Sequence, residues 1–141
     1  MISTRGRYAL RVIIDLAEHR SGKYIPMKEV AERQDISLKY LERILPDLTG
    51  GKIIEGIHGK GGGYKLTRNP DEITVLEILR LTEGDIAPVA CLSDGAAPCA
   101  KKNECRTLQM WEKYYELITG YFGGITIADL MKTEPGNDYV I

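Results

Sequence analysis

The sequence predicts a mainly α-helical fold with a small β-hairpin wing, that is, a winged helix-turn-helix followed by a long C-terminal helix. Three observations support this fold class. Apolar residues recur at helical spacing in three short segments before residue 50, a glycine-linked pair of β-prone pieces follows, and a long amphipathic segment begins near residue 106. The 141 residues are 43% hydrophobic and 28% charged, which suits one small globular domain with an appendage.

Three helices are expected in the first half of the chain. Residues 7–20 place their apolar side chains on one helical face. A second helix is expected over 26–34, because proline is favoured at the first helical position. Ser37 is a good N-cap for a third helix over 38–48, and Pro46 should bend the last turn of that helix because proline removes a backbone donor.

A β-hairpin is expected next. Residues 53–57 and 64–67 contain β-branched and aromatic side chains, and four of the six residues that join them are glycines. Thr74 and Glu77 then form the pattern of a capping box, which predicts a short helix to about residue 82.

The rest of the chain is expected to form a loop and further helix. Residues 84–104 are rich in Gly, Ala, Asp and Pro, which predicts a long loop. A long helix over 106–122 and a small helix capped by Thr126 complete the chain. The expected division is a DNA-binding winged helix-turn-helix at 1–83, a cysteine loop at 84–105, and a dimerisation helix with a C-terminal segment at 106–141.

Charge is distributed unevenly along the chain. Residues 1–66 contain twelve Lys and Arg against eight Asp and Glu, whereas residues 67–141 contain seven against twelve. A basic first half can contact phosphate, and an acidic second half suits self-association or small ligands. No signal peptide and no apolar run of the ~18 residues that cross a bilayer are present, so we expect a cytoplasmic protein with no membrane partner.

The third helix and the hairpin supply candidate contacts to double-stranded DNA. An α-helix fits the major groove, and the preceding helix braces it across the phosphate backbone. Because the apolar side chains of the third helix should face the core, its exposed N-terminal end would carry four candidate groove contacts: Lys39, Tyr40, Glu42 and Arg43. On the hairpin, His58 and Lys60 are expected at phosphate or in the minor groove.

Within this set, Arg43 is suited to pairing with guanine and Glu42 to accepting from cytosine N4. A charged face on a short helix is more often only a solvated face. The order of three helices followed by a basic glycine hairpin nevertheless favours DNA binding.

Cys91, Cys99 and Cys105 are the only cysteines, spaced C-x7-C-x5-C. An odd number argues against a disulfide framework, and a structural zinc site usually needs four Cys or His ligands. Two interpretations remain open from the spacing, namely incidental thiols and ligands of an iron–sulfur cluster. A thiol-redox enzyme is disfavoured because no C-x-x-C pair is present, and we expect no catalytic residues.

The long helix carries an apolar seam with 3-4-3-4 spacing, made of Leu108, Trp111, Tyr115, Ile118 and Phe122. Such a seam is typical of helix pairing between two copies of a chain. Packing against the first helix explains the pattern equally well, so both interpretations stay open.

The whole chain to about residue 131 resembles the Rrf-two family of winged-helix transcription regulators, in particular its IscR-like branch of iron–sulfur cluster regulators. The matching segments are 6–10 (GRYAL), 36–42 (ISLKYLE) and 59–64 (GKGGGY), together with the three cysteines before Trp111. The resemblance implies a homodimer, paired through the long helix, that binds a palindromic operator.

The resemblance also implies roles for particular residues. Lys39, Tyr40, Glu42 and Arg43 fall at positions that face the major groove, and His58 at a wing position. The three cysteines fall where cluster-binding members hold an iron–sulfur cluster, of the 2Fe–2S or 4Fe–4S type. The fourth ligand departs from the family pattern, because Leu108 stands where one branch has histidine and Arg7 where another has aspartate.

We therefore expect a homodimeric repressor or dual regulator that senses iron–sulfur cluster, redox or nitric-oxide status. The first alternative is a cluster-free regulator of the same family that responds to a metabolite or a partner protein. The more distant alternative is the thiol-redox enzyme.

Overall fold

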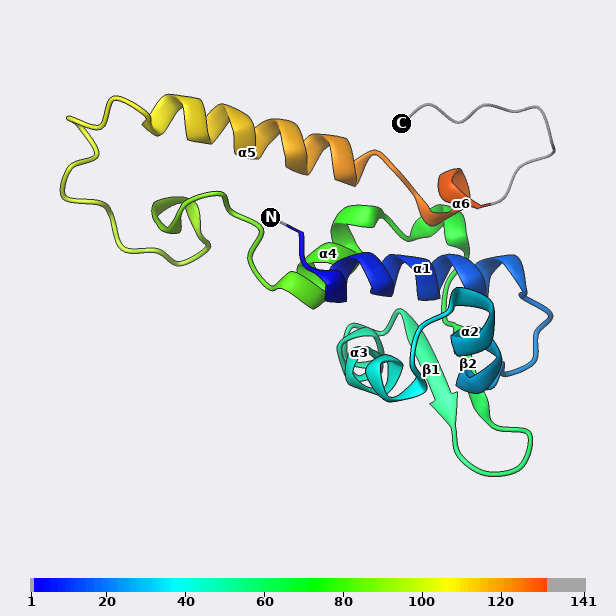
Figure 1. Ribbon diagram of the computed structural model, residues 1–141. Coiled ribbons are helices and arrows are strands. Elements are labelled where there is room, and N and C mark those ends of the chain that lie inside the picture. Colours follow the sequence, from blue (N-terminus) through cyan, green and yellow to red (C-terminus); the bar gives the residue numbers. More distant parts are fainter. Residues whose placement is uncertain (1, 132–141) are drawn as a thin grey trace.

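Figure 1 shows the computed structural model, which describes residues 2–131. The predicted fold class is confirmed, since the chain is mainly helical with one two-stranded antiparallel sheet. The end of the segment predicted at 106–141 lies outside the described residues. In chain order, the elements are α1 (Thr4–Glu18), α2 (Met27–Gln34), α3 (Leu38–Gly50), β1 (Ile54–Ile57), β2 (Gly63–Leu66), η1 (Pro70–Glu72), α4 (Val75–Glu83), η2 (Ala90–Leu92), α5 (Leu108–Gly123) and α6 (Ile127–Leu130).

Helix α1 is the centre of the fold. It contacts α2, α3, α4, α6 and β2, and in Figure 1 it runs between α4 on one side and α2 and α3 on the other. Val12, Ile13 and Leu16 are at most 1% exposed, because the helical period places them on the face that the other elements cover. The helix begins earlier than predicted, since the Ser3 hydroxyl accepts from the backbone N–H of Gly6 and caps its first turn.

Helices α2 and α3 form the helix-turn-helix. Pro26 is the N-cap of α2 rather than its first residue. Asp35 adopts the left-handed conformation (φ 53°) and Ile36 packs into the core, which turns the chain sharply. The Ser37 hydroxyl then accepts from the N–H of Tyr40 at 3.1 Å, which confirms Ser37 as the N-cap of α3. Helix α3 continues through Pro46 to residue 50, two residues beyond the predicted end.

The wing is a hairpin of β1 and β2 in which Ile54 pairs with Leu66 and Ile57 with Gly63. The segment before α2 anchors it, because Ile25 and Tyr64 exchange two backbone hydrogen bonds of 2.8 and 2.9 Å. A Cβ on Gly63 would lie 2.2 Å from the Ile25 carbonyl oxygen, so only glycine permits this contact. Gly63 is therefore needed by the hairpin itself, whether or not the wing approaches DNA.

Helix α5 lies on the opposite side of the molecule from α3 and the wing (Figure 1). None of its residues is fully buried. Its C-terminal end is fixed to the rest of the fold, since the Val75 N–H donates to the Ile125 carbonyl at 2.9 Å and the Ile127 N–H to that of Ile73 at 2.8 Å. Ile127 is completely buried in the core.

Of the two capping boxes that the sequence suggests, the one at α6 forms completely and the one at α4 forms only in part. Thr126 and Asp129 form a complete capping box at the start of α6, as expected. At α4 the Thr74 hydroxyl accepts from the Glu77 N–H at 3.1 Å, but the Glu77 carboxylate pairs with Arg68 instead of returning to the N-cap. The carboxylate binds the arginine in preference to a backbone N–H, because a hydrogen bond between two ionised groups is stronger than one to a neutral donor.

Candidate nucleic-acid interface

The recognition surface of α3 follows from the packing of its opposite face. Leu41, Ile44, Leu45 and Leu48 are at most 5% exposed, as the spacing predicted. Lys39, Glu42 and Arg43 are exposed as a result. Within residues 2–131, none of these three side chains forms an ion pair or a side-chain hydrogen bond. Their charges are thus available to a partner.

Tyr40 differs from the other three predicted groove residues, because it is half-buried. Its ring meets the edge of the Tyr8 ring, with centroids 5.4 Å apart. The Arg11 guanidinium lies 5.2 Å from the centre of the Tyr8 ring, and Arg11 also donates to the carbonyl of Gln34 at the end of α2. Tyr40 is therefore held in place by α1.

Two polar networks fix the helix-turn-helix against α1. The Arg5 guanidinium donates to the Asp47 carboxylate (Nε–Oδ2 2.9 Å) and to the backbone oxygen of Arg43 (2.9 Å), which ties the first turn of α1 to α3. Asp15, only 1% exposed, accepts from Arg33 at 2.7 Å and from Gln34 at 2.8 Å, which ties α1 to α2. The hydrogen bond to Asp15 raises the pKa of Arg33 above its ordinary value.

The Asp15 network and the brace at Arg5 were not anticipated from the sequence. The available signal was an aspartate in the middle of the apolar face of α1, beside Val12 and Leu16. A buried carboxylate needs a cationic or hydrogen-bonding partner, so this position pointed to a pair whose second member the sequence did not identify.

The two predicted phosphate contacts lie in the turn of the wing, between β1 and β2. His58 and Lys60 are exposed, and neither side chain pairs with another side chain of the described part of the chain. Strand β1 contacts α3, and both elements lie on the side of the molecule away from α5 (Figure 1). The structure thus brings five of the six predicted DNA contacts to the surface of adjoining elements, with Tyr40 partly covered.

The three cysteines lie in the segment between α4 and α5. All three are exposed, and none forms a disulfide. Cys91 and Cys99 line one cavity of about 330 Å³, together with Leu108 and Glu112. The Cys105 thiol does not line it and instead lies 3.6 Å from the Thr107 hydroxyl. That hydrogen bond, followed by the Thr107 backbone N–H, lowers the pKa of Cys105.

Thiols are the donor type that iron–sulfur clusters require. No three Cys, His, Asp or Glu side chains among residues 2–131 lie close enough together to hold a metal ion. The three thiols are therefore suitable ligands for a cluster, but the loop does not bring them together into a formed binding site. Glu112, one helical turn after Leu108, is a carboxylate near two of the thiols that the sequence analysis did not single out.

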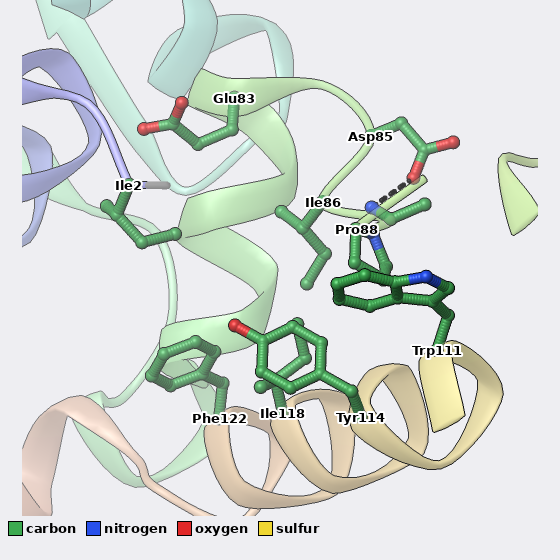
Figure 2. A pocket seen from close by; sticks show the side chains of 10 residues that line it. Ile2, Glu83, Asp85, Ile86, Pro88, Trp111, Tyr114, Ile118 and Phe122 are labelled. Carbon is green, nitrogen blue, oxygen red and sulfur yellow. Dashed lines mark hydrogen bonds between the residues drawn. The ribbon is translucent and has the colours of Figure 1, made fainter. Parts of the chain in front are cut away.

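Helix α5 has two apolar faces. The five residues of the predicted seam, from Leu108 to Phe122, are all half-buried. Figure 2 shows Trp111, Ile118 and Phe122 facing a hollow whose other side carries Ile2 and Ile86. The seam therefore faces the chain's own fold, but α5 packs mainly against α4 and not, as the packing interpretation expected, against the first helix. A second stripe with 4-3-4 spacing is 48–58% exposed and consists of Met110, Tyr114, Leu117 and Tyr121.

Comparison with known proteins decides the family. The family model described as "Rrf2: Iron-dependent Transcriptional regulator" matches residues 2–133. The chain belongs to the Rrf2 family. The resemblance inferred from the GxGGGY wing and the cysteine spacing is confirmed.

Relatives of this Rrf2 regulator agree in sequence and in fold. The HTH-type transcriptional regulator IscR of Xenorhabdus nematophila is 31% identical over 133 residues, which cover 94% of this chain and 80% of that protein. The solved structure of CymR, the global cysteine regulator of B. subtilis, has a TM-score of 0.75 at 31% identity and covers 92% of this chain and 95% of that one. The structure of T. potens IscR has a TM-score of 0.71 at 30% identity, with 92% and 85% covered.

Transcription regulation and DNA binding follow from membership of the Rrf2 family. The named relatives are transcription regulators, and their fold is the fold of this chain. Among the helices at residues 2–131, none combines the length and apolar character that a bilayer crossing needs.

Proposed function

We propose that this Rrf2 protein is a cytoplasmic, homodimeric repressor that binds a palindromic operator and senses iron–sulfur cluster, redox or nitric-oxide status through its cysteine loop. One observation carries the DNA-binding part. Lys39, Glu42 and Arg43 stand exposed on α3 with no partner in the described chain, beside a wing that carries His58 and Lys60. Binding in the groove requires charged side chains that have no partner within the protein, carried by a helix that is held in place.

The roles of the six residues differ. Arg43 pairs with the N7 and O6 of a guanine and Glu42 accepts from a cytosine N4, since these are the base edges that match their donors and acceptors. Lys39 lies in the major groove beside them, and His58 and Lys60 contact phosphate or the minor groove and set the register of the protein on the duplex. Tyr40 is held between α1 and the groove by Tyr8, so it positions the N-terminal end of α3.

The second chain of the proposed dimer pairs through the exposed stripe on α5. Four apolar side chains with 4-3-4 spacing on one face match the seam of a two-helix pair. Leu117 alone is 58% exposed, and a contiguous apolar stripe of this kind usually marks an interface. Two recognition helices related by a twofold axis would read half-sites about 34 Å apart or a multiple of that.

The proposed cluster ligands are Cys91, Cys99 and Cys105, with the Glu112 carboxylate in the fourth position. An iron–sulfur cluster supplies reversible redox and nitric-oxide chemistry when it is bound. Cys91, Cys99 and Glu112 already line or adjoin one cavity, whereas Cys105 lies apart. Binding therefore requires the loop at 84–105 to rearrange, and this rearrangement would be the signal.

A chain of contacts links the loop to α3. The loop begins directly after Glu83, whose carboxylate accepts from the Ser3 N–H at 2.9 Å and the Ser3 hydroxyl at 2.6 Å. Ser3 caps α1, and Arg5 in the same turn holds Asp47 and the Arg43 backbone oxygen. A shift of the loop would thus reach the recognition helix through the first turn of α1. Sensing further requires that the cluster bind the two arrangements unequally.

Two measurements test this proposal. Protein purified without oxygen should show the visible absorbance of a cluster, and Cys99→Ala should remove it. A colourless, iron-free protein refutes the sensor part. For DNA, operator binding is measured by fluorescence anisotropy for Arg43→Ala, with Lys101→Ala in the exposed loop as a control of equal charge change. Arg43→Ala should lower discrimination at one base pair by about 1–3 kcal/mol, and an unchanged affinity would show that the groove assignment is wrong.

A cluster-free regulator is the second candidate. The observation in its favour is that the described cysteines, as arranged, do not form a metal site. Operator binding that responds to neither oxygen nor loss of the cysteines would favour it. The thiol-redox enzyme is disfavoured, because the three cysteines are spaced C-x7-C-x5-C and include no C-x-x-C pair.

A further inference from the structure

Two apolar side chains are exposed on the elements that are proposed to meet DNA. Among residues 2–131, the exposed large hydrophobic side chains are those of the α5 stripe together with Leu38 and Ile57. Leu38 is 40% exposed and is the first residue of α3, and Ile57 is 47% exposed and ends β1. Single exposed leucines are common on protein surfaces, so the position of Leu38 has to decide whether it has a role.

The start of α3 does not need a leucine at position 38 for its own packing. Ser37 is the N-cap, so a hydrophobic staple would join the residue before the cap to the fourth residue of the helix, that is, Ile36 to Leu41. These two side chains are 6% and 0% exposed, and both belong to the core. The apolar contact that fixes the entry to α3 is thus made without Leu38.

The charges around Leu38 suit a duplex. Helix α3 has no acidic residue in its first turn, although the positive end of a helix favours one, and Lys39 stands there instead. Arg43 lies one turn later and is also exposed, and Glu42 offsets only one of these two positive charges. The N-terminal end of α3 therefore presents an apolar side chain within a positive potential, which attracts the phosphates on both sides of a groove.

Leu38 shares a helical face with Glu42, the residue proposed to read a cytosine. Residues four apart lie on the same side of an α-helix and about 6 Å apart along its axis. Successive base pairs of a duplex are about 3.4 Å apart. A base that Leu38 contacts should therefore lie within about two base pairs of the base that Glu42 contacts.

We propose that Leu38 contacts the C5-methyl group of a thymine in the major groove and determines specificity at that base pair. Thymine is the base that presents a methyl group in the major groove, and apolar side chains recognise it. The leucine side chain has no hydrogen-bonding group, so it cannot read the donors and acceptors of the other base edges. The contact rests on the proposed function, because it needs α3 in the major groove.

Removal of one methyl group from the DNA tests the contact without any change to the protein. A duplex that the full-length protein binds is first selected from a random library, and each of its thymines is then replaced in turn by deoxyuridine, which lacks only the methyl group. At one thymine the replacement should weaken binding about fourfold in fluorescence anisotropy, as expected for one buried methyl group. If no thymine responds, the proposal is wrong.

Variants show which side chain contacts the methyl group. Leu38→Ala should bind the thymine and deoxyuridine duplexes equally, because alanine is too short to reach the methyl group, whereas Leu38→Met stays apolar at similar size and should keep most of the difference. Ile57→Ala is the matched control, since it truncates the other exposed apolar side chain near DNA and should leave the difference unchanged. Thermal unfolding checks that each variant folds. A fourfold difference that persists in Leu38→Ala overturns the proposal.

The location of the thymine gives an independent check. The thymine that responds to loss of its methyl group should lie within about two base pairs of the position at which Glu42→Gln lowers discrimination. A responding thymine farther away would contradict a shared face for Leu38 and Glu42 in the groove, and with it the proposed contact.

The same duplexes separate the two proposals. A protein that selects no duplex, or whose affinity is unchanged by Arg43→Ala, refutes the proposed function and the thymine contact together. A protein whose affinity falls with Arg43→Ala but does not respond to deoxyuridine keeps α3 in the groove and refutes the thymine contact alone.

Discussion

The buried carboxylate of Asp15 allows a quantitative prediction. Asp15 is 1% exposed and accepts from Arg33 and Gln34, while the Arg33 side chain is 31% exposed. Asp15→Asn keeps the volume but removes the charge, and places an amide N–H against donors. Hydrogen bonds to a charged acceptor are worth about 1.5–3 kcal/mol each, and the partly exposed guanidinium recovers some hydration, so we expect a loss of about 2 kcal/mol in the free energy of unfolding.

Urea unfolding followed by circular dichroism measures this loss, since the midpoint shifts while the slope stays constant if only stability changes. Glu29→Gln is the matched control, because Glu29 pairs with the same Arg33 at 3.8 Å but is 57% exposed. An exposed pair of that kind should contribute less than about 0.5 kcal/mol. If Asp15→Asn costs no more than Glu29→Gln, the argument that this network fixes α2 against α1 is wrong.

Four further changes test other parts of the structure. Gly63→Ala places a Cβ 2.2 Å from a carbonyl oxygen at φ +150° and should cost about 1–3 kcal/mol in a thermal melt, whereas Gly22→Ala (φ +82°), with open space around it, carries only the backbone strain. Ile127→Ala, at a fully buried site, should cost about 2–5 kcal/mol in urea unfolding. Leu117→Glu should give monomers in sedimentation and a melting temperature that is lower and no longer depends on protein concentration, and dimers at micromolar concentration would contradict the proposed stripe. Glu83→Ala removes the acceptor for Ser3 and should cost about 1 kcal/mol and weaken operator binding, while unchanged binding would contradict the proposed link to α3.

Local sequence patterns predicted the elements of the DNA-binding half because each is set by nearby residues. Ser37 caps α3 through a hydrogen bond that spans three residues. The spacing of Leu41, Ile44 and Leu48 defines the buried face of α3, and the remaining positions form its exposed face. Exposure of Arg43 follows from the same spacing. The helix limits moved by only a few residues, since capping decides them and several residues compete for the cap.

What the sequence did not predict depends on contacts between distant segments. The partners of Asp15 lie on the next helix, 18 and 19 residues away, and the anchor of the wing at Ile25 lies 39 residues from Tyr64. The inward direction of the α5 seam depends on where α4 and the loop lie. The loop at 84–105 has no periodicity, so spacing alone left the arrangement of its cysteines open.

The burial of Ile127 has a practical consequence for any attempt to isolate the DNA-reading half. A chain cut after residue 105 would lose the side chain that closes the core beside Ile73 and Ile78, together with the two backbone hydrogen bonds to Ile73 and Val75. Such a fragment would expose apolar surface and fold poorly. Helix α6 therefore closes the core, and cutting the chain before α5 would open the core of the winged helix-turn-helix half.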